Sequence, residues 1–170
     1  GIINKLSVIA NGFYNCFFIL SQLSKEQVNC GINYDITLSM FLVFVGLLSL
    51  HSDNIVKSSF DDKKFIRGII ELKVIESSRD GQLIYPFYFY VKCLLRNANK
   101  NELVGLIADL KVLNLFYAYA KTKEAFMNDV LDLFDVLIAE QKTALISTTV
   151  IREVFAILED VLNNNNNNNN

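Results

Sequence analysis

The stretch NELVGLIADLKVLNLFYAYAKTKEAFMNDVLDLFDVLIAE, residues 101–140, contains two helical patterns joined by a short polar break. In the first pattern, residues 102–120, apolar side chains follow two stripes at helical spacing. In the second, residues 124–139, they follow one stripe opposite polar residues. A helix that is apolar on two sides must be covered on two sides. We therefore predict an all-α fold of stacked antiparallel helices, with residues 102–120 inside the stack and residues 124–139 on its outside.

The residues of the first pattern make this prediction specific. Leu113 and Phe116 lie on different stripes, so both should be buried if the helix is covered on both sides. One stripe contains Leu103, Leu106, Leu110, Leu113 and Tyr117, and the other contains Val104, Val112, Leu115, Phe116 and Tyr119.

The composition of the chain leaves little polar material for its surface. Of 170 residues, 52% are hydrophobic, and the mean hydropathy is +0.29. We expect some apolar surface to be covered by a partner, by more of the same polypeptide or by lipid. The net charge of -2 gives no general attraction to nucleic acid, so no nucleic-acid partner is expected.

The domain organisation is predicted to be simple. Residues 1–162 are long enough for one all-helical domain, and the start at Gly1 leaves open that the chain is a fragment of a longer one. Asn163–Asn170 is a homopolymer of a kind that is normally disordered. It is interpreted either as a natural low-complexity tract or as placeholder residues.

The three cysteines, Cys16, Cys30 and Cys93, are odd in number and widely spaced. This pattern argues against a disulfide framework and favours free, buried thiols. It predicts an intracellular, cytoplasmic protein.

Ile36–Leu50 is a strongly apolar run of 15 residues without a charge, and it lies between Asp35 and His51. A membrane-spanning helix needs about 20 apolar residues. This run is shorter, so we predict a buried core helix that Asp35 caps. A membrane or membrane-surface segment is the alternative.

Further helices are expected on both sides of these segments. Apolar residues recur at helical spacing in residues 2–23 and from Asp61 or Asp62 to Ser77, and Pro86 suits the first turn of a helix that we place from Phe87. Ser77–Gly81 is predicted to be a turn, and a last helix should run from Thr148 or Thr149 to Leu162.

A weak internal repeat accompanies this pattern. Gly46–Phe60 aligns with Cys93–Ile107, and Tyr117–Leu131 has the same shape: an apolar helix end, a polar turn and the next apolar helix. Residues 37–162 therefore resemble the armadillo/HEAT-like helical repeat superfamily. The resemblance implies an α-solenoid, and an irregular helical bundle is the alternative because the repeat period is not kept.

The residues needed for catalysis do not form a recognisable set. His51 is the single histidine, and the sequence has no phosphate-binding glycine loop, nucleophile elbow or Cys-x-x-Cys pair. We predict no catalytic residues, no metal site and no cofactor, and hence no enzyme activity and no small-molecule ligand.

Two charged sets are the candidate partner-binding residues. The basic residues recur every four positions and form one stripe if the helix from Phe87 extends that far. The acidic residues recur every three positions on residues 124–139. The candidates are Lys92, Arg96, Lys100, Asp129, Asp132 and Asp135.

These patterns together favour an interaction module. The hypothesis is a non-enzymatic helical-repeat scaffold, or a subunit of a larger complex, that mediates protein–protein interaction. The alternative is a membrane-associated structural subunit that uses residues 36–50.

Overall fold

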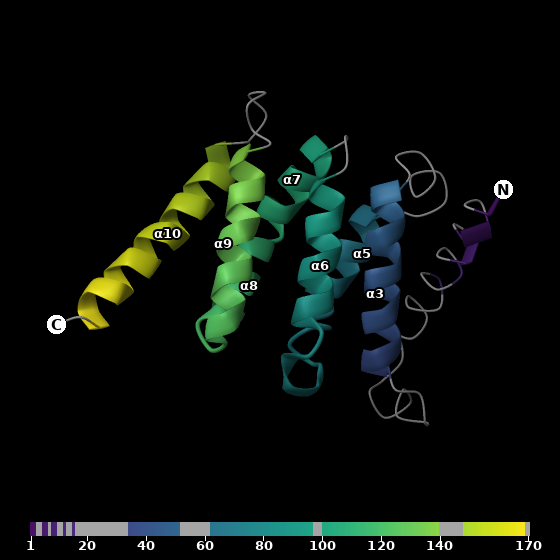
Figure 1. Ribbon diagram of the computed structural model, residues 1–170, viewed down its shortest axis with the longest axis horizontal. Coiled ribbons are helices and arrows are strands. Elements are labelled where there is room, and N and C mark those ends of the chain that lie inside the picture. The colour runs from purple at the N-terminus through teal and green to yellow at the C-terminus, as the bar shows by residue number, and fades with distance from the viewer. Residues whose placement is uncertain are drawn as a thin grey trace. The chain divides into compact units, whose positions relative to one another are not determined.

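A computed structural model describes residues 1, 2, 5, 6, 8, 9, 12 and 15, and residues 34–51, 62–96, 100–139 and 148–168 (Figure 1). The regular structure in these residues is helical throughout, which confirms the all-α class. The chain divides into two compact units, Gly1–Ala98 and Asn99–Asn170. Each unit is described by itself below. The single domain predicted for residues 1–162 stays a prediction.

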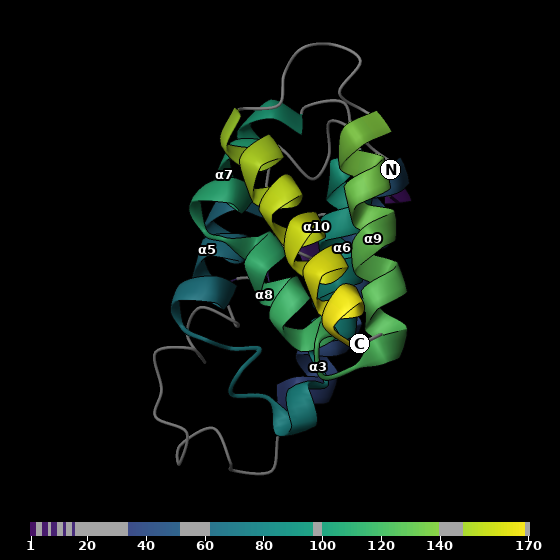
Figure 2. The same cartoon turned by 90° about the vertical axis from the view of Figure 1, so that its left-hand side faces the viewer.

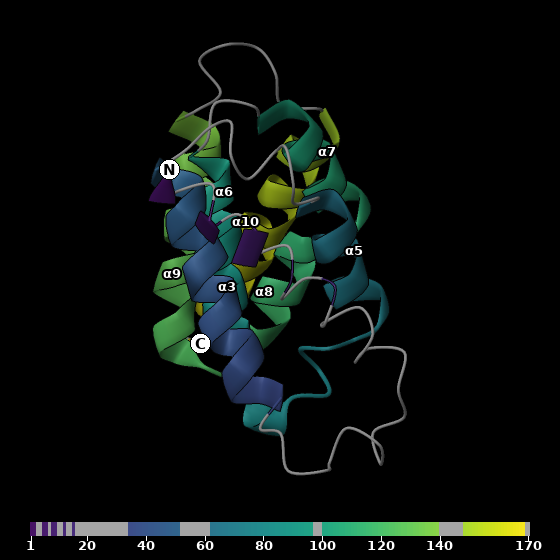
Figure 3. The same cartoon turned by 90° about the vertical axis from the view of Figure 1, so that its right-hand side faces the viewer.

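The first unit is built around two helices that lie side by side, α3 and α6 (Figures 1 and 3). Its described elements are α3 (Tyr34–His51), α5 (Asp62–Glu71), the 3-10 helix η1 (Arg79–Gly81) and α6 (Ile84–Leu95). Gly46 of α3 allows the close approach, because a Cβ atom there would lie 3.3 Å from Phe89 Cε1 and 3.4 Å from Tyr90 Cα.

Three aromatic rings from three helices form the centre of this unit. Phe65 of α5 stands edge-on to Phe41 of α3, with ring centroids 5.3 Å apart, and edge-on to Tyr90 of α6 at 5.6 Å. All three side chains are buried. Edge-to-face pairs add to the stability gained from burying the rings, so Phe65 links α3, α5 and α6.

α5 begins at Asp62, as expected, but ends at Glu71 rather than near Ser77. Lys73 has a left-handed backbone (φ 51°). The N–H of Val74 donates to the carbonyl of Ile69, and the N–H of Lys73 donates to that of Ile70. This pair of bonds is the Schellman motif, which ends a helix by satisfying its last carbonyls. The left-handed residue at Lys73 therefore terminates the helix, although no glycine marks the position.

The turn predicted at Ser77–Gly81 is present and is joined to α3. Asp80 and Gly81 both have positive φ angles, 54° and 64°. The carboxylate of Asp35 accepts a hydrogen bond from the backbone N–H of Arg79 at 3.0 Å. α3 begins at Tyr34, so Asp35 lies within its first turn and fastens η1 to it, instead of preceding the helix as a cap.

α6 confirms the helical interpretation of the segment that contains Pro86. It begins at Ile84, three residues before the predicted start at Phe87. Pro86 is in the first turn, where its missing N–H would have had no partner within the helix.

The second unit contains α7 (Lys100–Asp109), α8 (Val112–Ala120), α9 (Glu124–Ala139) and α10 (Thr148–Asn168). The prediction of one helix over residues 102–120 is wrong, because α7 and α8 meet at an angle of 61°. Lys111 has a left-handed backbone (φ 54°), and its N–H donates to the carbonyl of Ala108. The break lets α8 take a direction different from that of α7.

α8 is nonetheless covered on two sides, because it packs against both α9 and α10 (Figure 2). Leu113 and Phe116, from the two predicted stripes, are fully buried. Phe116 stands edge-on to Phe126 of α9, with ring centroids 6.2 Å apart. The prediction that both side chains are buried is confirmed.

α10 extends to Asn168, beyond Leu162, where the last helix was predicted to end. The helix is already formed when it reaches the asparagines, and each added residue needs no new nucleus.

The length of the apolar helices bears on the membrane alternative. Within the described ranges, no single helix is long and apolar enough to cross a membrane. The bent pair Leu103–Asp109 and Val112–Ala120 meets the requirement jointly, by length and composition.

Candidate functional site

One face of α3 exposes a row of apolar side chains at spacings of four, three, four and three residues. We call this row the α3 stripe. Met40, near its middle, is 68% exposed, and Ile36 is 52% exposed. α3 lies in front of α6 in the view of Figure 3. The residues of the stripe are Ile36, Met40, Val43, Leu47 and Leu50.

The opposite face of α3 is buried, so the helix is apolar around its circumference but covered on one side. Leu38, Phe41, Leu42 and Val45 form the buried face. The expectation of a buried core helix therefore holds for this face and is wrong for the α3 stripe. Alternation of three and four residues is the spacing that lets a second helix pack along a seam. The α3 stripe is the candidate binding surface.

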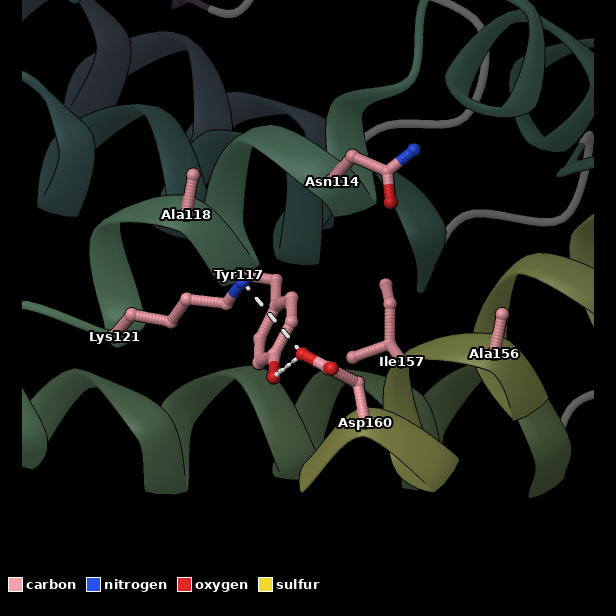
Figure 4. Close-up of a pocket in the computed structure, with 7 residues that line it drawn as sticks. All are labelled: Asn114, Tyr117, Ala118, Lys121, Ala156, Ile157 and Asp160. Carbon is pink, nitrogen blue, oxygen red and sulfur yellow. Dashed lines mark hydrogen bonds and ion pairs between the residues drawn. The ribbon is translucent and has the colours of Figure 1, made fainter. Parts of the chain in front are cut away.

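A second feature is a pocket of about 330 Å3 between α8 and α10 (Figure 4). Four of its residues follow one face of α8, and the others come from α10. It is lined by Asn114, Tyr117, Ala118, Lys121, Ala156, Ile157 and Asp160.

The polar groups of this pocket bind one another. The Tyr117 hydroxyl donates a hydrogen bond to the carboxylate of Asp160. Lys121 Nζ lies 3.6 Å from Asp160 Oδ2 and 4.5 Å from the centre of the Tyr117 ring. Burial, together with the hydrogen bond to Asp160 and its negative charge, raises the pKa of Tyr117 to about 12. At neutral pH Tyr117 is therefore a hydrogen-bond donor rather than a base, and the cluster fastens α10 to α8.

Glu153 of α10 lies at the beginning of α8. Lys111 precedes α8 and makes no side-chain capping bond. The backbone N–H of Asn114 instead bonds the Glu153 carboxyl, which places a negative charge near the positive end of α8. Among the described residues, Glu153 Oε1 is buried without a hydrogen-bond partner. Burial raises the pKa of Glu153 more than Asn114 and Lys111 lower it.

Glu153→Gln should stabilise the protein at neutral pH. The ionised carboxyl is less favourable in the folded chain than in the unfolded one, because its folded pKa is raised from 4.5. Stability is therefore fully present below 4.5 and is lost as pH rises through the raised pKa. Glutamine keeps an acceptor for Asn114 without ionising. Its denaturation midpoint should exceed that of the parent at pH 7, and the difference should shrink at pH 4.

The matched control for this prediction is Glu159→Gln, on an exposed position of the same helix. It should leave the midpoint nearly unchanged at both pH values. A parent protein that is more stable than the Glu153→Gln variant at pH 7 would contradict the sign.

The predicted basic stripe does not form on one helix. α6 ends at Leu95, Arg96 is its C-terminal capping residue, and Lys100 begins α7 in the other unit. Arg96 is exposed, whereas Lys92 is partly buried, with Nζ 5.7 Å from the centre of the Tyr88 ring. The basic stripe required one helix from Phe87 to Lys100, and α6 ends before Lys100. Partner binding by Lys92, Arg96 and Lys100 stays a prediction.

The predicted acidic residues do share one helix. Asp132 and Asp135 are exposed on α9, and Asp129 is partly buried. None of the three belongs to a cluster of potential metal ligands, and no such cluster of three or more occurs among the described residues. Their role in partner binding also stays a prediction.

Cys93 agrees with the expected free, buried thiol. It is buried in α6, and burial raises its pKa more than Arg96 and Lys92 lower it. Cys16 and Cys30 lie outside the described residues.

Two features described above were not predicted from the sequence: the exposed α3 stripe and the contact between Tyr117 and Asp160. The α3 stripe could have been found from its spacing, because an uncharged helix with apolar residues on every side has more apolar surface than one neighbour covers. The contact of Tyr117 with Asp160 joins residues 43 positions apart, and no local pattern pairs them. Comparison of the chain with models of protein families, curated proteins and solved structures finds no match in any of the three.

Proposed function

We propose that the chain is a non-enzymatic helical scaffold, or a subunit of a larger assembly, that binds a protein partner through the α3 stripe. The observation that carries this proposal is the exposure of Ile36, Met40, Val43, Leu47 and Leu50 along one helix face. Apolar rows of this kind are costly in water and are typical of binding surfaces. The partner element that fits the spacing is an amphipathic helix with its own apolar seam.

The armadillo- or HEAT-like arrangement and the cytoplasmic location belong to the same proposal. Helical repeat proteins bind partners along extended surfaces formed by successive helices. The unpaired cysteine count supports a reducing compartment.

Attachment to a membrane surface is the second candidate, because the α3 stripe could also contact lipid. Helices that lie in the membrane interface usually carry Lys or Arg beside their apolar face. Residues 36–50 contain neither, and the opposite face of α3 is buried in protein. A protein partner is therefore favoured.

The test is photocrosslinking in the cells that produce the protein. A photoreactive diazirine residue in place of Met40 should crosslink a peptide of another protein that has apolar residues at helical spacing. The same residue in place of Gln82, which is exposed in the first unit but lies outside α3, should give no such product. Sedimentation with membranes after carbonate extraction, without a protein crosslink at position 40, would replace this proposal with the membrane alternative.

A further inference from the structure

α10 carries a row of apolar side chains on its exposed side. The helix packs against α7 and α8, and its Val154 and Ile157 are buried. Its other side is turned toward the viewer in Figure 2. There Phe155 and Leu162 are each 63% exposed, and Leu158 is partly buried. We call Phe155, Leu158 and Leu162 the α10 seam. None of the three lines the pocket beside Tyr117, so the α10 seam is a separate surface.

The α10 seam has the spacing of a surface on which two helices pack. Its residues are three and four positions apart, and this alternation keeps apolar side chains along one line of contact. A second copy of the same helix can complete the contact when it runs antiparallel. Phe155 of each copy then lies opposite Leu158 of the other, and Leu162 extends the seam beyond these two layers. The α10 seam is therefore complementary to itself about a two-fold axis, which is the commonest symmetry of homo-oligomers.

The charges beside the α10 seam favour the same arrangement. Arg152 and Glu159 are exposed and seven residues apart, so they lie on the same edge of the seam. Along the axis they are about 10 Å from each other, beyond the three- or four-residue spacing of ion pairs within a helix. In the antiparallel register, Arg152 of one copy lies within about 3 Å, along the axis, of Glu159 of the other. The reverse pair follows from the symmetry.

A parallel pair of helices lacks this match. It would bring Arg152 to the level of Arg152 and Glu159 to the level of Glu159, so that like charges meet. Charged residues that flank an apolar seam set the choice and the orientation of the partner helix. The sequence of α10 thus specifies an antiparallel copy of itself.

We propose that two copies of this chain associate through the α10 seam as an antiparallel, two-fold pair. The contact does not involve the α3 stripe, so each dimer carries two α3 stripes. The interface is small, because each copy contributes three apolar side chains and two charged ones. It belongs with transient complexes rather than permanent ones. The copies separate on dilution, and unfolding measured at low protein concentration reports the monomer.

Sedimentation of the full chain over a range of concentrations tests the pair. The average mass should rise with concentration from 19.3 kDa, the mass of one chain, toward twice that value. Phe155→Glu places a charge in the seam of each copy and should leave the protein monomeric over the whole range. Met40→Glu is the matched control, because Met40 is as exposed as Phe155 but belongs to the α3 stripe. It should leave the dimer intact.

Charge reversal tests the orientation. Arg152→Glu and Glu159→Arg each bring like charges together at both symmetric contacts, so each should raise the dissociation constant of the dimer several-fold. An equimolar mixture of the two variants should associate about as strongly as the parent, because opposite charges meet again at both contacts. The double variant should recover in the same way.

Three results would overturn the proposal. One is a parent protein with the mass of one chain at every concentration. Another is a dimer that Met40→Glu disrupts and Phe155→Glu does not, which would assign the contact to the α3 stripe. The third is a dimer that neither charge reversal weakens, or that does not recover on mixing. Phe155→Glu should leave the photocrosslink from position 40 unchanged, so this proposal and the proposed function fail separately.

Discussion

Phe116→Ala should lower the free energy of unfolding by about 3–5 kcal/mol, and Leu113→Ala by about 2–5 kcal/mol. Both side chains are fully buried, they belong to the two predicted stripes, and α8 packs against α9 and α10. Each truncation removes apolar contacts and leaves a cavity that the neighbouring helices close only in part. The Phe116 variant also loses the edge-on contact with Phe126.

The measurement is the denaturant midpoint of each variant at unchanged slope. Phe155→Ala is the matched control, since Phe155 is an exposed phenylalanine on α10. It should stay within about 0.5 kcal/mol of the parent. If either buried variant also falls in that range, α8 is not covered on both faces.

Phe65→Ala should destabilise the protein by about 3–5 kcal/mol. Phe65 is fully buried, and its ring contacts Phe41 and Tyr90, so one truncation weakens the packing of α3, α5 and α6 together. Phe65→Leu keeps most of the apolar volume but removes the ring. Its loss should be smaller, and the difference between the two variants reports the cavity.

Thermal and denaturant unfolding of both variants would measure these losses. Met40→Ala is the control in the same unit, because Met40 lies on the exposed face of α3. Equal midpoints for Phe65→Ala and Met40→Ala would show that Phe65 does not hold the three helices together.

The helical class followed from the sequence because apolar spacing reports which residues face a core. The ends of the helices did not, and α5 and α7 show why. Two residues after the end of each helix stands a lysine with positive φ, Lys73 after α5 and Lys111 after α7. Glycine is the usual residue there, since side chains carry a penalty in this conformation. Here the packing of the apolar residues on either side outweighs that penalty of about 1–2 kcal/mol.

The candidate site was visible in part. The sequence shows an uncharged apolar run at residues 36–50, but the division of this run into a buried face and the α3 stripe depends on which neighbours contact α3. Gly46 admits α6 on one side, and a sequence pattern alone does not show which side that is. The contact of Tyr117 with Asp160 depends on where α10 lies, which is a property of the folded unit.

The separation of α3 from α6 along the chain has a consequence for synthesis. Once residue 51 has been added, the ribosome must add residues 52–95 before α6 is complete, which takes roughly 2–9 s at about 5–20 residues per second. During this interval the face of α3 that later packs on α6 is as bare as the α3 stripe. The helix carries no charge from Ile36 to Leu50. The nascent chain therefore passes through a period in which both faces of α3 are exposed and the chain is prone to aggregation.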